Sequence, residues 1–383
     1  MLSFYLLWSL VYLLLLGYLK RVWLTQALQV HSIKVLEEKV SLLVPIRNES
    51  ENLPELVRHL EKIEYSLLEV IFIDDQSSDG SKSLLENLIL EKPFWKVLSS
   101  DGIGKKAALQ KGISQAKGSI IVTTDADCDF NSNWLSVLLS PFSNSMVQLV
   151  AGPVMIQEMN SLLSYFQQLD WASIQLLTGV SFAKKSPLMC SGASLAFRRS
   201  AFETVEGYRG NENWLSGDDE FLLKKIVERF GPESVFYCPS KDVLVHTKGE
   251  ETLKALLNQR IRWAGKWKAH QSIRHGLSAF AVFGVQLVWI GSLGLIFLTP
   301  LGWAWAVLVW GIKAISEKVA LGAIASFYGY AVPGWAFIST SLLHPFYSIR
   351  VGIGAILGNY SWKGRRIQGN VNFGVNGNDR RRI

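Results

Sequence analysis

The sequence predicts an α/β protein in which a mostly parallel sheet is joined to apolar helices at both ends of the chain. Between residues 40 and 230, short runs rich in β-branched residues alternate with segments of helical spacing. Such alternation is typical of a parallel sheet that helices cover on both faces. The hydrophobic share of 49% and the 14 tryptophans exceed what a soluble enzyme normally needs, and the apolar residues gather at the two ends. A chain of 383 residues has room for one large domain and an additional part.

Residues 1–22 are expected to form an N-terminal transmembrane anchor. No charged side chain occurs before Lys20 and Arg21, and about 20 apolar residues are enough to span a bilayer. The segment has no basic start and no small-residue cleavage site, which favours a retained anchor over a signal peptide. Because basic residues are retained on the cytoplasmic side, this pair places the following domain in the cytoplasm.

The segment 38–249 carries the alternating pattern. Strands are expected at residues 40–46, 68–73, 96–98, 119–124, 147–151 and 194–197. Helices are expected at residues 51–63, 81–90, 105–116, 162–182 and 217–230.

Three further segments complete the chain. Residues 250–275 predict an amphipathic helix at the membrane surface, because apolar residues accompany five basic ones, Arg260, Arg262, Lys266, Lys268 and Arg274. Residues 277–360 predict transmembrane or interfacial helices; the uncharged stretch 277–312, with Pro300 near its middle, forms either one long span or a tight hairpin. If both basic flanks of this C-terminal region are cytoplasmic, the number of C-terminal membrane crossings is even, so two or four. The basic residues 361–383 are expected to be a disordered cytoplasmic tail.

The charges and cysteines narrow the possible partners. A net charge of +7 could suit a nucleic acid, but basic residues beside apolar segments more often follow the positive-inside rule, so we expect membrane lipids and no nucleic acid. Cys128, Cys190 and Cys238 are too far apart for a metal pattern and indicate a reducing compartment without disulfides. His344 and Arg350 interrupt an apolar stretch, where they either contact a lipid head group or snorkel to the interface.

Asp125 and Asp127 directly follow the strand expected at 119–124. Residues two apart on a strand point to the same face, and ligands of open α/β sheets bind at the carboxyl ends of strands. A divalent cation that bridges substrate phosphates needs only one or two protein carboxylates. The alternative is an acidic turn that caps the next helix. Asp129, the third acid of this run, has no assigned role.

Three other stretches place polar residues at strand ends or helix starts. VPIRNE, which includes Pro45, Arg47 and Glu49, leads into a helix whose free N–H groups could bind an anion, or it is an ordinary turn. The acids of DDQSSDG could accept hydrogen bonds from a ribose or a base, or they form Asx turns. Lys105 could contact a phosphate or be solvated.

Two later stretches could supply catalytic groups. Asp218 and Asp219 start a helix, where one acid could have a raised pKa and act as a general base, or both simply cap the helix. Gln259 and Arg262 share one helical face, and Arg262 could grip a phosphate while Trp263 offers a flat surface for a sugar ring. A helix at the membrane surface explains the same residues without catalysis.

In order along the chain, seven motifs resemble the motif series of membrane-bound family 2 glycosyltransferases: VPIRNE, DDQSSDGS, GKKAAL, DAD, CSGAS, GDDE and QRIRW. The resemblance implies a GT-A fold, a nucleotide-sugar donor, Mg2+ or Mn2+, and inversion at the anomeric carbon. It implies Asp127 as the metal ligand and Asp219 as the base, with Asp218 and Arg262 also catalytic. The implied substrate-binding residues are Pro45, Arg47, Glu49, Asp74, Asp75, Asp79, Lys105, Asp125, Gly192, Gln259 and Trp263.

Two departures from that family stand out. The acidic pair is Asp218-Asp219 where many relatives have Glu-Asp, which keeps the base but shortens its neighbour. The membrane portion is also small, without the long series of spans that a polymer-extruding synthase uses as a channel.

The expected function is therefore transfer of a sugar from a nucleotide-sugar donor to a lipid-linked or glycan acceptor at the cytoplasmic (inner) membrane. The expected donor is a UDP-sugar. A processive polysaccharide synthase shares every motif and remains an alternative. A non-catalytic nucleotide-sugar-binding protein would be expected to lack Asp127, Asp219 or Arg262, and all three are present. A nucleotidyltransferase would leave QRIRW unexplained.

Overall fold

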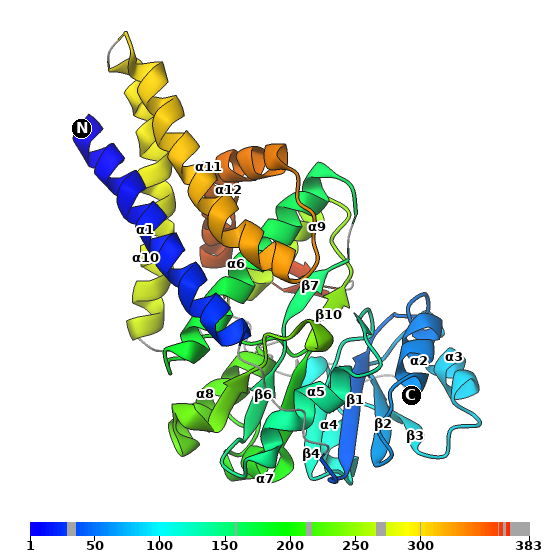
Figure 1. Ribbon diagram of the computed structural model, residues 1–383. Helices are drawn as coiled ribbons and strands as arrows, with labels where there is room; N and C mark the ends of the chain where they lie inside the picture. Colours follow the sequence, from blue (N-terminus) through cyan, green and yellow to red (C-terminus); the bar gives the residue numbers. More distant parts are fainter. Residues whose placement is uncertain are drawn as a thin grey trace.

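The computed structural model describes residues 1–28, 36–157, 159–211, 217–265, 273–298, 300–358, 360–362 and 365–367. An α/β domain occupies one end, and the helices α1 (Leu2–Ala27), α10 (Ile273–Gly291) and α11 (Gly302–Phe327) project from it side by side (Figure 1). The fold class is thus the one that the sequence predicts.

The main sheet has seven strands in the order β3-β2-β1-β4-β8-β6-β9. β1 pairs in parallel with β2 and β4, whereas β8 runs antiparallel to both of its neighbours, β4 and β6. The sheet is therefore mostly parallel, with one reversed strand. The strands are β1 (Val40–Ile46), β2 (Leu68–Asp74), β3 (Trp95–Ser99), β4 (Ile120–Thr123), β6 (Leu149–Ala151), β8 (Leu195–Arg198) and β9 (Val235–Tyr237).

Helices cover both faces of this sheet because its central strands are apolar on both sides. In β1, Leu42 and Val44 belong to one hydrophobic core and Leu43 to the other, as expected for the two-residue period of a strand. The first core includes residues of α2 (Leu53–Glu61), α3 (Ser81–Leu88) and α5 (Trp134–Leu139), and the second includes residues of α4 (Lys105–Gln115), α7 (Arg199–Thr204) and α8 (Asp218–Phe230).

A second, three-stranded sheet was not expected from the sequence. Its strands are β5 (Asp129–Phe130), β10 (Val245–Thr247) and β7 (Val154–Ile156), with β10 in the middle. At two or three residues each, they are too short to show a periodic pattern. This sheet places Thr247 beside Asp127.

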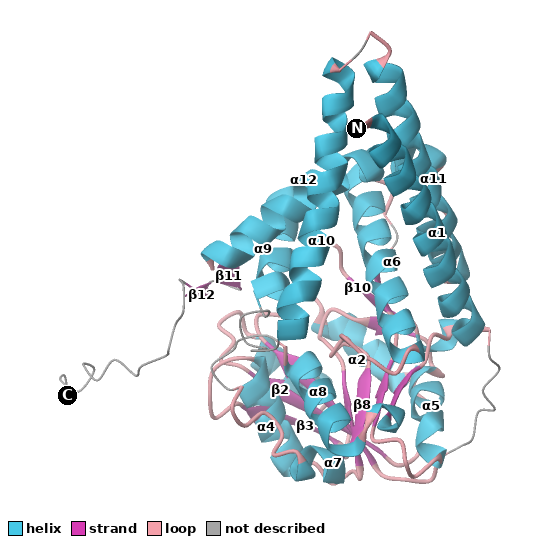
Figure 2. Ribbon diagram, turned by 90° about the vertical axis from the view of Figure 1, so that its left-hand side faces the viewer, coloured by secondary structure: helices cyan, strands magenta, loops and turns pink. Residues whose placement is uncertain are grey.

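Helix α6 (Leu162–Ala183) lies between the sheets and the long helices (Figure 2). It contacts β7 and β9 as well as α1, α11 and α12 (Gly334–Leu357). Trp23 of α1 is fully buried here, and its indole N–H donates to the carbonyl of Gln175 at 3.0 Å. A Cβ atom at Gly179 would lie only 2.4 Å from the Trp23 ring, so this contact requires glycine.

Among the described residues, α1 is the one helix long and apolar enough to cross a membrane. The chain turns back on itself between α10 and α11, near Pro300 (Figure 1). Of the two arrangements predicted for residues 277–312, one long span or a hairpin, this corresponds to the hairpin. α11 continues beyond the uncharged stretch and includes Lys313 and Glu317. Membrane crossing by α10, α11 and α12 stays a prediction.

The predicted surface helix 250–275 and the predicted tail differ from the structure. α9 ends at Ala264, and α10 already begins at Ile273; Lys266 and Lys268 lie outside the described residues. Arg260 is not on an exposed basic face but is 6% exposed, because it forms an ion pair with Asp170 of α6. At the start of the predicted tail, β11 (Tyr360–Trp362) pairs antiparallel with β12 (Arg365–Ile367). Residues 368–383 lie outside the described residues, so disorder there stays a prediction.

Lys313 and Glu317 form a buried ion pair that joins three of the long helices. Lys313 Nζ lies 2.6 Å from Glu317 Oε1 and also donates to the carbonyl of Ser341 in α12 at 2.9 Å. Tyr12 of α1 donates its hydroxyl to Glu317 Oε1 at 2.9 Å. Hydrogen bonds from α1 and to α12 thus complete the contacts of the pair, which indicates a structural role.

We expect Glu317→Gln to lower the thermal unfolding temperature in detergent. The substitution leaves the Lys313 ammonium buried without a negative partner, at a cost of about 3–5 kcal/mol. Glu86→Gln is the matched control, since Lys82 and Glu86 have the same spacing of four residues but are exposed and 3.9 Å apart. Its effect should stay within about 0.5 kcal/mol. Equal shifts for the two variants would contradict the structural role.

Candidate active site

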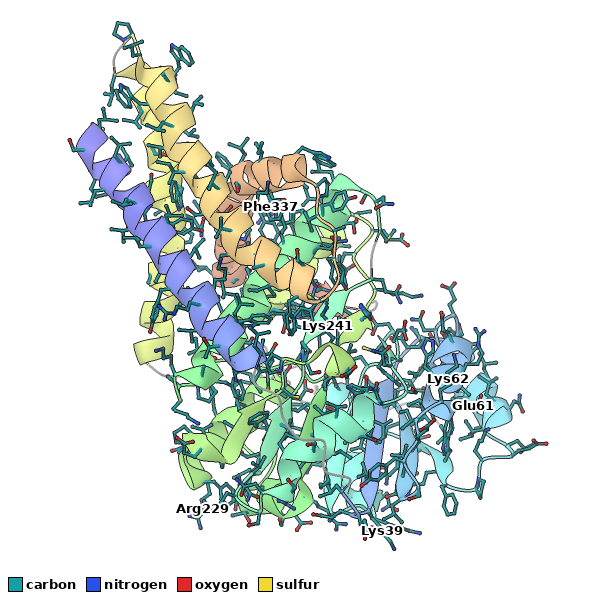
Figure 3. The ribbon with its side chains drawn as sticks, in the orientation of Figure 1. Lys39, Glu61, Lys62, Arg229, Lys241 and Phe337 are labelled. Atoms are coloured by element: carbon teal, nitrogen blue, oxygen red, sulfur yellow. The ribbon has the colours of Figure 1, made fainter. Side chains whose placement is uncertain are left out.

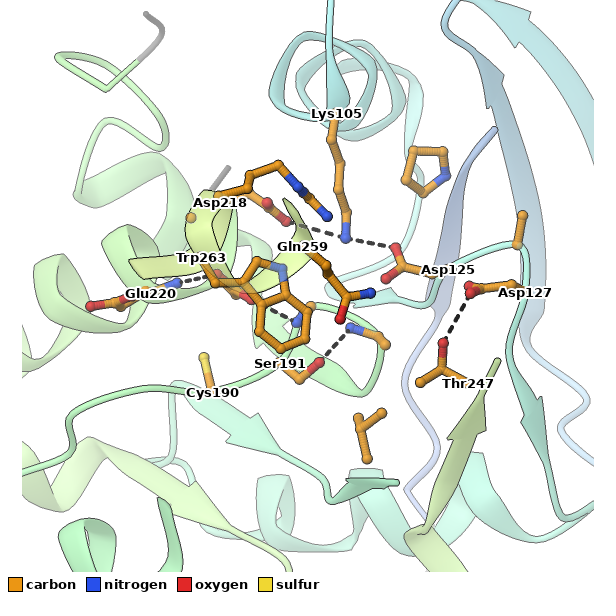
Figure 4. A pocket seen from close by; sticks show the side chains of 18 of the residues that line it. Lys105, Asp125, Asp127, Cys190, Ser191, Asp218, Glu220, Thr247, Gln259 and Trp263 are labelled. Atoms are coloured by element: carbon orange, nitrogen blue, oxygen red, sulfur yellow. Dashed lines mark hydrogen bonds and ion pairs between the residues drawn. The ribbon is translucent and has the colours of Figure 1, made fainter. Parts of the chain in front are cut away.

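A cavity of about 790 Å³ lies at the carboxyl ends of β1, β2 and β4, and α6, α8 and α9 (Leu253–Ala264) complete its walls (Figure 4). Of the catalytic, substrate-binding and metal-ligating residues that the sequence predicts, all except Asp74 and Asp79 line it. They are Pro45, Arg47, Glu49, Asp75, Lys105, Asp125, Asp127, Gly192, Asp218, Asp219, Gln259, Arg262 and Trp263.

Asp125 and Asp127 follow β4 and face the cavity, as expected. Thr247 donates its hydroxyl to Asp127 Oδ2 at 2.9 Å, which orients this carboxylate (Figure 4). Burial raises the pKa of Asp127 to about 6, and the negative charges of Asp125 and Glu49 contribute to the rise. Negative charge is therefore crowded at this edge of the cavity.

Lys105 lies between two groups of acids. Its ammonium donates to Asp125 Oδ1 at 2.6 Å and lies 3.6 Å from Asp218 Oδ2 (Figure 4). Burial alone would lower the pKa of Lys105, but the carboxylates of Asp125 and Asp218 outweigh it and raise the pKa above its ordinary value. Lys105 is thus a permanent positive charge at the centre of the cavity, and its contact with a phosphate stays a prediction.

Asp219 is held in one orientation at the start of α8. Its Oδ2 accepts a hydrogen bond from the Gly192 N–H at 3.0 Å, and its Oδ1 accepts one from the Glu220 N–H at 2.7 Å. A Cβ at Gly192 would lie 3.0 Å from Asp218 Oδ2 and 3.2 Å from Lys105 Nζ, so a side chain would crowd both groups. The glycine of CSGAS therefore allows its backbone N–H to reach Asp219.

The β1–α2 and β2–α3 loops are joined by Arg47 and Asp79. Arg47 Nη1 donates to the carbonyls of Asp75 and Gln76 at 2.5 and 3.2 Å. Asp79 accepts hydrogen bonds from the N–H groups of Ser50 and Ser81, both at 3.0 Å. Burial tends to raise the pKa of Asp79, but these hydrogen bonds outweigh it and lower the pKa well below its ordinary value.

Three acids lie away from the cavity: Asp74 and Asp79, which belong to the predicted site residues, and Asp129, which is close to them in the sequence. Asp79 connects the two loops just described, and Asp74 accepts from the Ser77 N–H at 3.3 Å. Asp129 lies 3.3 Å from His59 Nδ1. Substrate binding by Asp74 and Asp79 stays a prediction, and these contacts are the ones that the structure shows for them.

The helices α6 and α9 form the opposite wall. Gln259 donates to Glu250 Oε1 at 2.7 Å, and Trp263 meets Trp171 of α6 edge to face, with ring centroids 5.5 Å apart. The sequence does not predict the α6 residues of this wall, which are Trp171, Ile174, Gln175 and Thr178. Because α6 is apolar or small on most of its circumference, its spacing carries no signal that separates the cavity face from the core.

The donor set suits a divalent cation that takes most of its ligands from a substrate. In the described part of the chain, no three His, Cys, Asp or Glu side chains are grouped so as to hold a metal by themselves. Mg2+, however, commonly uses one or two carboxylates, and its other ligands are water and phosphate oxygens. The crowded acids around Asp127 fit that use, because a bound cation would offset both causes that raise its pKa, its burial first and the neighbouring negative charges second.

Comparison with known sequences finds similarity to glycosyltransferases. Residues 41–206 match the family model described as Glycosyl transferase family 2. The chain is 28% identical over 239 residues to poly-beta-1,6-N-acetyl-D-glucosamine synthase of Staphylococcus epidermidis, covering 59% of this chain and 54% of that protein. It is also 28% identical over 237 residues to beta-monoglucosyldiacylglycerol synthase of Trichormus variabilis, covering 59% and 48%. The chain thus spans about half the length of these curated relatives.

Among solved structures, the chain is similar to a mannosyltransferase of Pyrobaculum calidifontis in complex with GDP-Man and Mn2+. The TM-score is 0.58 at 18% identity, and the match covers 93% of this chain and 96% of that one. At this identity the likeness concerns the fold, and it extends over the long helices as well as the α/β domain. Residues 41–206 therefore match a glycosyl transferase family 2 domain, and the fold is GT-A, as the motif series predicted.

Proposed function

We propose that the protein is a metal-dependent, inverting glycosyltransferase that moves a sugar from a nucleotide sugar to a lipid-borne acceptor. One observation carries the proposal. A single cavity holds the acids of the DAD motif, the oriented carboxylate of Asp219 and the QRIRW helix, although these come from distant parts of the sequence.

The donor is proposed to bind along β1, β2 and β4. Pro45, Arg47 and Asp75 line that side of the cavity, with Asp125 beside them. Asp127 would hold Mg2+ or Mn2+, which when bound neutralises the charge that builds up on the leaving diphosphate. Arg262 of the opposite wall would add a positive charge there. We expect the donor to be a UDP-sugar, and GDP-sugars are the alternative donors to compare with it.

Asp219 is proposed as the general base. As the acceptor hydroxyl attacks the anomeric carbon, its proton passes to a carboxylate oxygen of Asp219. The new carbon–oxygen bond forms on the side opposite the diphosphate, whose bond to the sugar breaks, so the configuration inverts. Proton removal of this kind typically contributes about 10²–10⁴-fold to the rate.

The outer surface of the helices supports a lipid-borne acceptor. Large apolar side chains are exposed on α1, α11 and α12, among them Phe4, Leu7, Trp303, Trp335 and Phe346. By contrast, the charged residues Lys39, Glu61, Lys62 and Arg229 lie at the surface of the α/β domain (Figure 3). This division is typical of a protein that is inserted into a membrane by one end. Together with Lys20 and Arg21, it supports a catalytic domain on the cytoplasmic side.

We expect Asp219→Asn to abolish sugar transfer and to leave nucleotide binding nearly intact, because the amide cannot accept the proton. Transfer is measured with radiolabelled nucleotide sugar, and binding by calorimetry with the nucleoside diphosphate and Mn2+. Asp242→Asn, at an exposed acid away from the cavity, is the matched control and should transfer normally. Wild-type turnover of Asp219→Asn would remove the assignment.

Asp127→Ala should weaken nucleotide binding when Mn2+ or Mg2+ is present and have little effect after chelation. Asp129→Ala is a close control, because Asp129 is only two residues away but pairs with His59 outside the cavity. Calorimetry of both variants, with and without chelator, tests the metal site. Unchanged metal-dependent affinity in Asp127→Ala would show that Asp127 is not a ligand.

The length of the product separates the proposal from its main alternative. A processive polysaccharide synthase is the second candidate, since one relative is named as a synthase of such a polymer. Membranes incubated with UDP- and GDP-sugars should yield a lipid-extractable product with a single added sugar. A ladder of water-soluble polymer would favour the processive synthase.

A further inference from the structure

A buried ion pair lies directly behind the α6–α9 wall of the cavity. Arg260 of α9 is 6% exposed and Asp170 of α6 is 8% exposed, and Arg260 Nε donates to Asp170 Oδ2 at 2.8 Å. Neither residue lines the cavity. A buried pair is by itself weak evidence for stability, because removing the charges from water costs about as much as their attraction returns. Its contacts indicate another role.

Arg260 contacts two cavity residues from behind. Its Nη1 donates to Gln259 Oε1, and its guanidinium carbon lies 4.2 Å from the centroid of the Trp263 ring. The same guanidinium lies 5.4 Å from the Trp171 ring, the other indole of this wall. A cation over an indole face is a favourable contact that fixes the plane of the ring. One guanidinium thus orients the Gln259 amide and the Trp263 indole together.

Asp170 orients that guanidinium and also connects it to α12. Its second oxygen, Oδ1, faces His344 Nε2 at 3.7 Å. His344 thus faces Asp170 while its side chain stays 27% exposed, and its contact with a lipid head group stays a prediction. Burial tends to raise the pKa of Asp170, but Arg260 and His344 lower it below its ordinary value. Asp170 is thus a carboxylate with a cationic partner at one oxygen and an imidazole near the other.

The helix that carries His344 is closely packed against α9. A Cβ at Gly354 of α12 would lie 2.4 Å from Ile261 Cδ1, so the two helices are in direct contact. On the outside of α12, Leu342, Leu343 and Phe346 are exposed. The pair therefore lies between the cavity wall and a helix with an apolar outer surface.

We propose that Asp170 and Arg260 are positioning residues, which hold Gln259 and Trp263 in the arrangement that receives the acceptor. The inference rests on the proposed transferase function, because it assigns a role within the same cavity. It predicts that loss of the pair disturbs acceptor use while donor binding, at the β1–β2–β4 side, is retained.

Two variants test this in the full-length protein. Asp170→Asn removes the partner that orients Arg260, and Arg260→Lys keeps the buried charge pair but lacks the planar fork that also reaches Gln259. Glu203→Gln is the matched control, because Arg199 and Glu203 form an exposed arginine–carboxylate pair at 2.9 Å.

The first measurement is the near-ultraviolet circular dichroism of the tryptophans, which needs no acceptor. The difference spectrum between wild type and Trp263→Phe defines the signal of that indole. We expect Asp170→Asn and Arg260→Lys to lose most of this signal and Glu203→Gln to keep it. Calorimetry with UDP and Mn2+ should give affinities within about twofold of wild type, as expected for sites that do not share partners.

The second measurement is transfer to vesicles of the lipid extract on which the wild type is active. We expect kcat/KM for the acceptor to fall by up to about 10²-fold, as misplacement of a positioning group can cause. If Asp170→Asn no longer binds UDP, that variant is misfolded, and the measurements on Arg260→Lys then decide whether the pair has a positioning role. An intact Trp263 signal in Arg260→Lys overturns the inference. A wild type that transfers to no acceptor would refute the proposed function instead, and the spectra would still decide the positioning.

Discussion

Helix α6 has to pack on two sides at once, and the cavity depends on that double packing. One side presents Trp171 and Ile174 to the cavity, whereas the backbone near Gln175 and Gly179 receives Trp23 of α1. Since the Trp23 ring lies too close to Gly179 for any side chain there, α1 and α6 have little freedom to shift independently. The wall of a site in the α/β domain is thus placed by helices outside that domain.

The cavity also concentrates charge. Eight carboxylates line it, and Lys105 lies between those that follow β4 and those that start α8. Burial is the larger cause of the raised pKa of Asp127, and the second cause is repulsion from the carboxylates of Asp125 and Glu49. A ligand that brings a divalent cation would relieve that repulsion. The electrostatics of the cavity are therefore consistent with the proposed metal-bound donor.

Much of the fold was predictable because the signals are local. The bounds predicted for β1 agree with the structure, and those for β2 differ by one residue, since both strands are continuous apolar runs buried on two faces. The motif residues converge because the carboxyl ends of parallel strands meet at one edge of the sheet. The small second sheet was missed, because strands of two or three residues have no readable period.

The sequence by itself determined the order of the elements, the motif series and the groups of residues at one edge of the sheet. It did so because period, capping and turn preferences act over a few residues. Only the tertiary structure decided that Arg260 is buried and not on a basic surface, since its partner Asp170 is 90 residues away. The same holds for Thr247 beside Asp127 and for the α6 wall of the cavity. These contacts depend on how distant segments pack, and no local pattern records that packing.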